Sequence, residues 1–265
     1  MEIFESHAHY DDEKFEMDRE EIIKSAYNSG VTKIISAGYS LEGSKRSIEL
    51  SDKYPFIYST AGISPNDINE NYEQEIDEID QILFNIFFEK GKPAKKRVAV
   101  GEIGLDYHYD NDKEKQKIAF IKQIHIANKY NLPIVIHTRE AVMDTIQILK
   151  ENQVNMRGVF HCCPFNRELV KEALKLGFYI SFSGTVTFKN AKNAKEIVNM
   201  VPNDRFLVET DSPYLAPEPV RGTRNDSRNL KYIINKISAF RGEEPETVAK
   251  QAYQNTMRLY KIGNA

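Results

Sequence analysis

Residues 2–11 read Glu2-Ile3-Phe4-Glu5-Ser6-His7-Ala8-His9-Tyr10-Asp11, an apolar beginning followed by a polar end. The first half is typical of a strand, and side chains alternate between the faces of a strand, so His7 and His9 point to the same side. Neutral imidazole is the commonest metal ligand in proteins, which makes the two residues a candidate ligand pair. A cation needs more ligands than two, and these must come from elsewhere in the chain. The alternative is a pair of polar residues at a strand end.

The composition of the 265 residues is that of a globular protein, with 41% hydrophobic and 28% charged residues. The net charge of −3 does not provide the broad positive field with which proteins hold duplex DNA, so any contact with nucleic acid must be local. Cys162 and Cys163 are adjacent, a spacing that suits neither a disulfide framework nor a structural zinc site. We therefore expect a cytoplasmic protein with no signal peptide and no membrane segment.

Short runs of β-branched residues alternate with helical patterns along the whole chain. The expected strands cover 3–9, 31–37, 56–62, 98–103, 133–137, 158–161, 179–182 and 205–211, with a basic turn at 91–97 before the fourth. The expected helices cover 18–29, 41–53, 73–88, 113–130, 141–152, 167–176, a segment ending near 202, 230–240 and 247–260, with Ser40 and Asp112 as N-caps.

This alternation is typical of parallel sheets built from βαβ units. Eight strands in a chain of this length predict an α/β protein, a (β/α)8 TIM barrel, and no linker divides residues 1–265 into more than a single domain. The alternative is an open doubly wound sheet, which would lack a glycine-rich phosphate loop after its first strand.

Six potential ligands lie at the carboxyl ends of the expected strands: His7, His9, Glu102, His137, His161 and Asp211. In a barrel such residues converge on one mouth. Any one of them, taken singly, can be a satisfied core residue. Burying all of them together without a cation would be costly, however, so the pattern favours a metal site.

Four imidazoles and two carboxylates are more ligands than one tetrahedral ion needs, and we expect two divalent metal ions. Nitrogen and oxygen ligands suit zinc, manganese, cobalt or iron, and magnesium also stays open. Glu102 is the natural shared ligand of the two ions. Asp211 is expected to bind one ion and to act as the general base toward a metal-activated water, which makes Asp211 and Glu102 the candidate catalytic residues.

Several blocks resemble the TatD family of metal-dependent deoxyribonucleases, a family of amidohydrolase-like metal barrels. The blocks are 6–11 (SHAHYD), 101–107 (GEIGLDY), 137–141 (HTREA), 160–162 (FHC), 209–217 (ETDSPYLAP) and 221–225 (RGTRN). The resemblance implies hydrolysis of phosphodiester bonds in DNA, in single strands or at 3′ ends, by a monomer. It also implies that the same six side chains are the metal ligands.

The resemblance further implies that Arg139 and the 221–225 loop, with Arg221, Arg224 and Asn225, lie near the substrate. Guanidinium groups suit phosphate oxygens, although a solvated loop is an equal alternative for each arginine. Two blocks depart from the family pattern. Family members commonly carry His in the block after the third strand, where this chain has 62–67 (GISPND), and Phe-Ser-Gly where it has Cys163-Pro164-Phe165. Ser64 and Asn66 can still donate hydrogen bonds to a substrate.

Three functions therefore stay open. The first is a metal-dependent nuclease that acts on DNA, in which the aromatic side chains Tyr107, Tyr109 and Phe165 can stack on bases. The second is a hydrolase of small esters, amides or phosphoesters, because the same ions polarise a carbonyl group as readily as a phosphoryl group. The third is a binding protein that keeps the metal for stability alone. We assign no role to His125, and an exposed loop residue is the expected state of His108.

Overall fold

A computed structural model describes residues 1–88 and 96–263 of the chain. The basic turn expected at 91–97 lies outside these residues except for Lys96 and Arg97. The described chain divides into two compact units, the first formed by 1–35 together with 161–265 and the second by 36–160.

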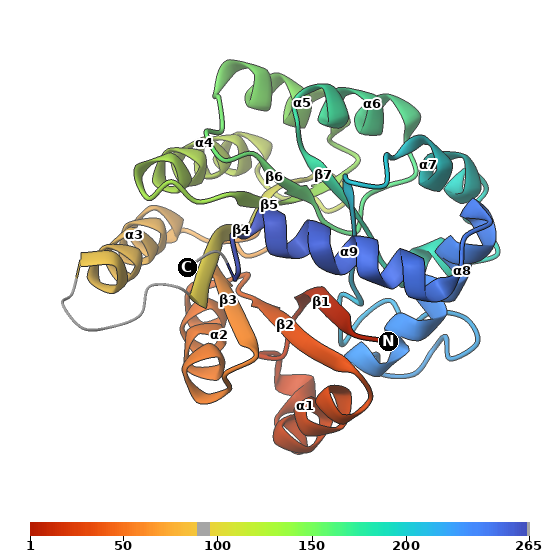
Figure 1. Cartoon of the computed structure of the whole chain (residues 1–265). Coiled ribbons are helices and arrows are strands. Elements are labelled where there is room, and N and C mark those ends of the chain that lie inside the picture. Colours follow the sequence, from red (N-terminus) through yellow and green to blue (C-terminus); the bar gives the residue numbers. More distant parts are fainter. Residues whose placement is uncertain (89–95, 264–265) are drawn as a thin grey trace. The chain divides into compact units, whose positions relative to one another are not determined.

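Strands and helices alternate along the chain (Figure 1). The strands are β1 (Ile3–Ala8), β2 (Val31–Ala37), β3 (Ile57–Ala61), β4 (Arg97–Asp106), β5 (Ile134–Arg139), β6 (Gly158–Phe160), β7 (Tyr179–Phe182) and β8 (Phe206–Val208). The α-helices are α1 (Arg19–Asn28), α2 (Leu41–Lys53), α3 (Tyr72–Phe88), α4 (Lys113–Lys129), α5 (Val142–Glu151), α6 (Arg167–Lys175), α7 (Ala194–Met200), α8 (Leu230–Arg241) and α9 (Pro245–Leu259). Short 3-10 helices are η1 (Glu13–Phe15), η3 (Gly184–Thr187) and η4 (Ser227–Asn229).

The sheet has eight strands in the order of the sequence, β1 to β8. The pairs β3–β4, β4–β5, β5–β6 and β7–β8 are parallel. A helix follows each of these strands, as parallel pairing requires. This architecture confirms the predicted fold class, an α/β protein of the (β/α)8 barrel type. The single domain over 1–265 stays a prediction.

The first unit is organised around β1, whose six residues are all buried. Helix α9 packs on β1 and β8 (Figure 1). The rings of Phe4 and Tyr253 lie 5.6 Å apart in this contact. Gly30, with φ +104°, follows α1 and lets the chain turn into β2 in a conformation that other residues rarely adopt. The strand that carries His7 is therefore held by buried apolar side chains.

In the second unit, α2 and α4 begin at the N-cap residues that the sequence predicts. The Ser40 side chain accepts from the backbone nitrogen of Gly43 at the start of α2, and Asp112 accepts from Glu114 and Lys115 at the start of α4. Each bond satisfies a backbone donor that the first turn of a helix leaves without an intrahelical partner. These helices pack on β3 and β4 and so support the ends of those strands.

Two strand ends differ from the sequence prediction by three residues, and the other strand boundaries differ by two residues or fewer. β8 ends at Val208 rather than at 211, because Asp211 has φ +58° and the chain turns away from extended geometry. β4 continues to Asp106 rather than ending at 103, because it stays paired with β5 up to the partners Asp106 and Arg139. Both differences fall at carboxyl ends of strands, where the predicted ligands lie.

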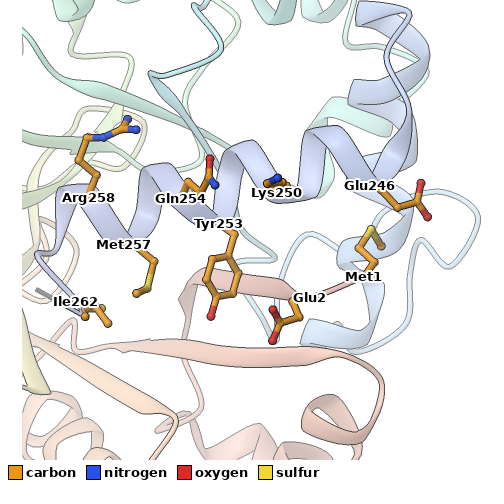
Figure 2. Close-up of a pocket in the computed structure, with 10 residues that line it drawn as sticks. Met1, Glu2, Glu246, Lys250, Tyr253, Gln254, Met257, Arg258 and Ile262 are labelled. Atoms are coloured by element: carbon orange, nitrogen blue, oxygen red, sulfur yellow. The ribbon is translucent and has the colours of Figure 1, made fainter.

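A pocket of about 720 Å³ lies in the first unit beside α9 (Figure 2). One side is the helix face that carries Lys250, Tyr253 and Met257, and Met1 and Glu2 lie opposite. None of the predicted site residues lines it. Among the helices in the described part of the chain, none combines the length and the apolar character needed to cross a membrane.

Candidate functional site

The first unit brings His7, His9 and Asp211 into contact. The Nε2 atoms of the two histidines lie 3.2 Å apart, and Oδ1 of Asp211 lies 3.6 Å from Nε2 of His7 and 3.3 Å from Nε2 of His9. Backbone bonds hold the three together: Asp211 donates to the carbonyl of His7, and His9 donates to the carbonyl of Ser212. His7 lies in β1 and His9 directly follows its last residue, Ala8, and the two imidazoles lie near one carboxylate.

These separations fit a metal ion. Ligand atoms that surround a tetrahedral ion at about 2.0–2.1 Å lie about 3.3 Å from one another. The three measured distances, 3.2, 3.3 and 3.6 Å, lie close to that value. The donor set of two imidazole nitrogens and a carboxylate oxygen is also typical of zinc and related ions. The residues present therefore suit a divalent cation.

His161 joins the same group from the segment that follows β6. Its ring stacks on that of His7, with centroids 4.1 Å apart and an angle of 15° between the planes. Its Nδ1 lies 3.4 Å from Oε1 of Glu209. Glu209 is fully buried, and its Oε2 has no hydrogen-bond partner among the described residues. A buried carboxylate beside a ligand histidine commonly fixes the orientation of the ring.

Asp211 is the charged member of this group. Burial raises its pKa, but the hydrogen bond with His9 and the nearby charges of His9, His161 and His7 outweigh burial and hold the pKa below its ordinary value. The carboxylate is therefore ionised at neutral pH. An ionised carboxylate is the form that binds a cation and that accepts a proton from water.

Of the two cysteines beside His161, Cys163 is buried and Cys162 is half-buried. Sγ of Cys162 lies 3.0 Å from the hydroxyl oxygen of Ser183. Burial, together with the negative charges of Asp211 and Glu209, raises the pKa of Cys162 well above its ordinary value. Burial raises the pKa of Cys163 as well. Both thiols stay protonated at neutral pH, and a protonated thiol is a poor nucleophile and a poor metal ligand.

The second unit brings Glu102 and His137 into contact on the neighbouring strands β4 and β5. Nδ1 of His137 lies 2.9 Å from Oε1 of Glu102, and its Nε2 lies 2.9 Å from Oδ2 of Asp106. Burial raises the pKa of Asp106, but hydrogen bonds from His137, Asn66 and the backbone of His108 lower it to about 2. His137 thus lies between two carboxylates.

Ser64 and Asn66 lie in the loop after β3 and bond within the protein. The Ser64 hydroxyl donates to Oδ2 of Asp67 over 2.7 Å. The Asn66 side-chain amide donates to Oδ2 of Asp106 over 3.0 Å. Asn66 is exposed and Ser64 is buried. Asn66 therefore reaches the Glu102–His137 pair through Asp106.

Arg139 is the last residue of β5 and is exposed. Its guanidinium group lies 5.5 Å from the centre of the Tyr109 ring, which is 52% exposed. His108 is an exposed loop residue, as expected, with Nδ1 2.8 Å from Oε1 of Glu140. Tyr107 instead donates its hydroxyl to Asp144 over 2.7 Å. Of these two tyrosines, Tyr109 presents the accessible ring.

The 221–225 loop places its three predicted substrate residues in different surroundings. The guanidinium of Arg221 lies 4.0 Å from the centre of the Phe188 ring. Arg224 forms a two-pronged ion pair with Asp18, with N–O distances of 2.9 and 2.6 Å. Asn225 is buried and donates its side-chain amide to the carbonyls of Thr210 and Tyr214. Asn225 thus supports the segment that carries Asp211.

Sequence reasoning assigned no role to Asp106 or Glu209. A signal for both was present, because Asp106 follows Glu102 by four positions on one strand and Glu209 precedes Asp211 by two. Residues at even spacings share a strand face. The sequence does not say which histidine each carboxylate contacts.

The comparison with protein families identifies the chain. A family model described as TatD related DNase matches residues 4–261. The chain belongs to the TatD family. This result confirms the resemblance that the sequence blocks indicate.

Other TatD-related proteins match over nearly their full length. The chain is 38% identical to the uncharacterized metal-dependent hydrolase YabD of Bacillus subtilis, over 98% of this chain and 99% of that protein. It is 29% identical to a protein of Escherichia fergusonii named 3′-5′ ssDNA/RNA exonuclease TatD, over 94% and 95% of the two chains. The crystal structure of YJJV, a TatD homologue from Escherichia coli K12, matches with a TM-score of 0.89 and 25% identity, over 98% of both chains. This TatD-family chain is thus a metal-dependent hydrolase.

Proposed function

We propose that this hydrolase cleaves phosphodiester bonds in DNA, in single strands or at 3′ ends, and acts as a monomer. The observation that carries the proposal is the spacing of 3.2–3.6 Å among Nε2 of His7, Nε2 of His9 and Oδ1 of Asp211, which suits a divalent cation. The match with the Escherichia fergusonii relative covers 94% of this chain and 95% of that protein. The name of that relative, an ssDNA/RNA exonuclease, supports a nucleic-acid substrate.

The proposed site uses two divalent ions, of zinc, manganese or magnesium. The proposed metal ligands are His7, His9, His161 and Asp211 in the first unit and, considered separately, Glu102 and His137 in the second. When bound, such ions polarise a phosphoryl oxygen and activate a water molecule. Asp211 and Glu102 are the proposed catalytic carboxylates.

The protein side chains supply the proton transfer and the substrate contact. Asp211 is ionised and accepts the proton of the attacking water on a carboxylate oxygen. Arg139 is exposed at the end of β5, two residues after His137, and its guanidinium group is suited to hold a phosphate oxygen. Tyr109 offers an accessible ring beside Arg139 on which a base of a single strand can stack.

A second function, hydrolysis of a small phosphoester or ester, is favoured by the loop contacts. Arg224 is neutralised by Asp18, and Asn225 is buried against backbone carbonyls, so neither offers a ready contact to a long polyanion. Asn66 bonds to Asp106. A small substrate needs fewer contacts than an oligonucleotide.

One experiment separates these functions. Metal-stripped protein is supplied with magnesium, manganese or zinc and incubated with end-labelled single-stranded DNA, duplex DNA and RNA, and with a small phosphodiester and a small carboxylic ester. Asp211→Asn is the inactive variant, and Asp18→Asn is the matched control, because Asp18 lies in the same unit and bonds to Arg224 rather than to a histidine.

Metal-dependent shortening of single strands by the wild type and by Asp18→Asn, and not by Asp211→Asn, supports the nuclease. Turnover of a small ester alone, with no nucleic acid cleaved, contradicts it and supports the second function. Binding of metal with no turnover of any substrate contradicts both, and leaves the metal a purely structural role.

A further inference from the structure

Asp106 is a buried carboxylate that the proposed reaction does not use. It is 1% exposed at the end of β4. Its Oδ2 lies 2.9 Å from Nε2 of His137 and accepts from the side-chain amide of Asn66 over 3.0 Å. Its Oδ1 accepts from the backbone nitrogen of His108 over 2.9 Å. Three contacts from three segments thus fix the plane of this carboxylate.

The backbone of Asp106 is held as firmly as its side chain. The buried Gln116 accepts from the Asp106 nitrogen over 2.8 Å and donates to the Asp106 carbonyl over 2.9 Å. Helix α4, which carries Gln116, therefore anchors the end of β4. The carboxylate has little freedom to move away from His137.

Each ring nitrogen of His137 lies 2.9 Å from a carboxylate oxygen, so its proton can face either Glu102 or Asp106. A neutral imidazole has one N–H group, and the other nitrogen presents a lone pair. A proton on Nε2 is donated to Asp106, and the lone pair of Nδ1 then faces Oε1 of Glu102 at 2.9 Å. Two lone pairs at this distance repel one another unless a cation lies between them. Two neighbouring ligands of an octahedral ion, at about 90° with bonds of about 2.0–2.1 Å, lie about 2.9 Å apart.

We propose that Asp106, itself held by Asn66, is a positioning residue that fixes the Nε2-protonated form and the ring orientation of His137. Nδ1 of His137 and Oε1 of Glu102 are thereby directed at a common cation. Asp106 contacts neither the cation nor the substrate. The inference rests on the proposed function, because it requires His137 and Glu102 to be metal ligands.

Asn66 is part of the same device. Its side-chain amide supplies the second contact to Oδ2 of Asp106, over 3.0 Å. Because Asn66 is exposed, its replacement does not open a cavity. Replacing Asn66 is therefore expected to disturb the fold less than replacing the buried Asp106.

The test is the affinity of metal-stripped protein for zinc ions alone, measured by calorimetry and by competition with a chromogenic chelator. Asp106→Asn is expected to weaken the binding of one ion by about 10- to 100-fold, the usual effect of losing a carboxylate behind a ligand histidine. Asn66→Ala is expected to weaken the same ion by a few-fold. Asp144→Asn is the matched control, because Asp144 accepts from the hydroxyl of Tyr107, next to Asp106 in sequence, and does not bond to His137. Its affinities are expected to stay within about two-fold of the wild type.

A second readout separates positioning from a purely structural role. In the proposal, the zinc concentration for half-maximal hydrolysis rises in Asp106→Asn by the same factor as the dissociation constant, while KM for the substrate is unchanged. A structural role lowers the melting temperature of the metal-free variant without changing the metal affinity of its folded form. If Asp106→Asn does not fold, Asn66→Ala provides the same comparison.

The outcomes for the two proposals are distinct. If Asp106→Asn folds and binds both ions as tightly as the wild type, the role of Asp106 is overturned, whatever the substrate is. If Asp106→Asn does not fold, the same result in Asn66→Ala overturns it. A wild type that binds two ions but cleaves no nucleic acid contradicts the nuclease alone, and the zinc titrations still test Asp106. A wild type that binds no metal overturns both.

Discussion

Glu5 on β1 accepts two hydrogen bonds from Thr210, a residue 205 positions further along the chain. The bonds come from the backbone nitrogen of Thr210 over 2.9 Å and from its hydroxyl over 2.6 Å. Both residues are fully buried. Since Glu5 precedes His7 by two positions and Thr210 precedes Asp211, this contact ties the histidine strand to the segment that carries the carboxylate.

Glu5→Ala is expected to destabilise the protein by about 2–4 kcal/mol. The substitution leaves the backbone donor and the hydroxyl of Thr210 without their acceptor in a buried place and creates a cavity. Urea unfolding of the metal-free protein measures the change. Thr223→Val, which removes an exposed hydroxyl bonded to a carbonyl, is the control and should change stability by less than about 1 kcal/mol. Equal losses of stability in the two variants would argue against a stabilising role of the Glu5–Thr210 hydrogen bonds.

Asp211→Asn is expected to lower kcat by at least about 100-fold at saturating metal while the protein stays folded. The amide has the size of the carboxylate but cannot accept the proton of water, and general bases contribute about 10²–10⁴-fold. Initial rates and circular dichroism are the measurements. A variant with the wild-type rate would remove Asp211 from the reaction.

Zinc is expected to raise the melting temperature of the metal-stripped wild type. A ligand that binds only the folded state at 100 times its dissociation constant adds about 2.7 kcal/mol. For a chain of this size that is about 5–10 °C. His9→Ala removes one of the three clustered ligand atoms, so its melting temperature should respond much less to the same zinc concentration. Magnesium and manganese titrations on the same instrument rank the metals.

The ion pair of Asp18 and Arg224 predicts a weak dependence of stability on pH. The hydrogen bond from Arg224 lowers the pKa of Asp18 below its ordinary value in the folded protein. The folded state therefore favours the ionised carboxylate, and the contribution is fully present above the unfolded pKa of about 3.9 and is lost as pH falls through the lower, folded pKa. Because both side chains are about one third exposed, the contribution should be below about 1 kcal/mol.

Asp18→Asn tests the pH range over which this ion pair contributes to stability. The stability difference between the wild type and the variant, followed by urea unfolding between pH 3 and 7, should be constant at the upper end and shrink at the acid end. A difference that grows toward acid pH would have the wrong sign for this ion pair.

Arg139→Ala is expected to raise KM for an oligonucleotide by about 10-fold or more, because a charge-assisted hydrogen bond to phosphate contributes about 1.5–3 kcal/mol. Arg224→Ala should have a smaller effect, since Asp18 already occupies its guanidinium fork. Steady-state kinetics at low salt measure both. A larger effect at Arg224 than at Arg139 would reverse this assignment of the phosphate contact.

The elements of the fold were predictable because each has a local cause. Ser40 and Asp112 cap the helices that the sequence predicts, since an N-cap acts on donors two or three residues away. The end of β8 was not predictable. Residues 205–211 have the apolar pattern of a strand, but Asp211 turns to positive φ, where its neighbour Thr210 is held by Glu5.

The sequence by itself determined the α/β class, the eight strands and the membership of the TatD family, because hydrophobic periodicity and motif spacing are properties of neighbouring residues. It also predicted that the side chains of His7 and His9 point to the same side, although β1 ends at Ala8 and His9 follows it. Only the tertiary structure decided which partner each polar side chain takes. Asp18 forms an ion pair with Arg224, and Asp106 forms hydrogen bonds with both Asn66 and His137. The physical reason is that a hydrogen bond depends on distances of about 3 Å between atoms, and these pairs come from segments that only the folded chain places together.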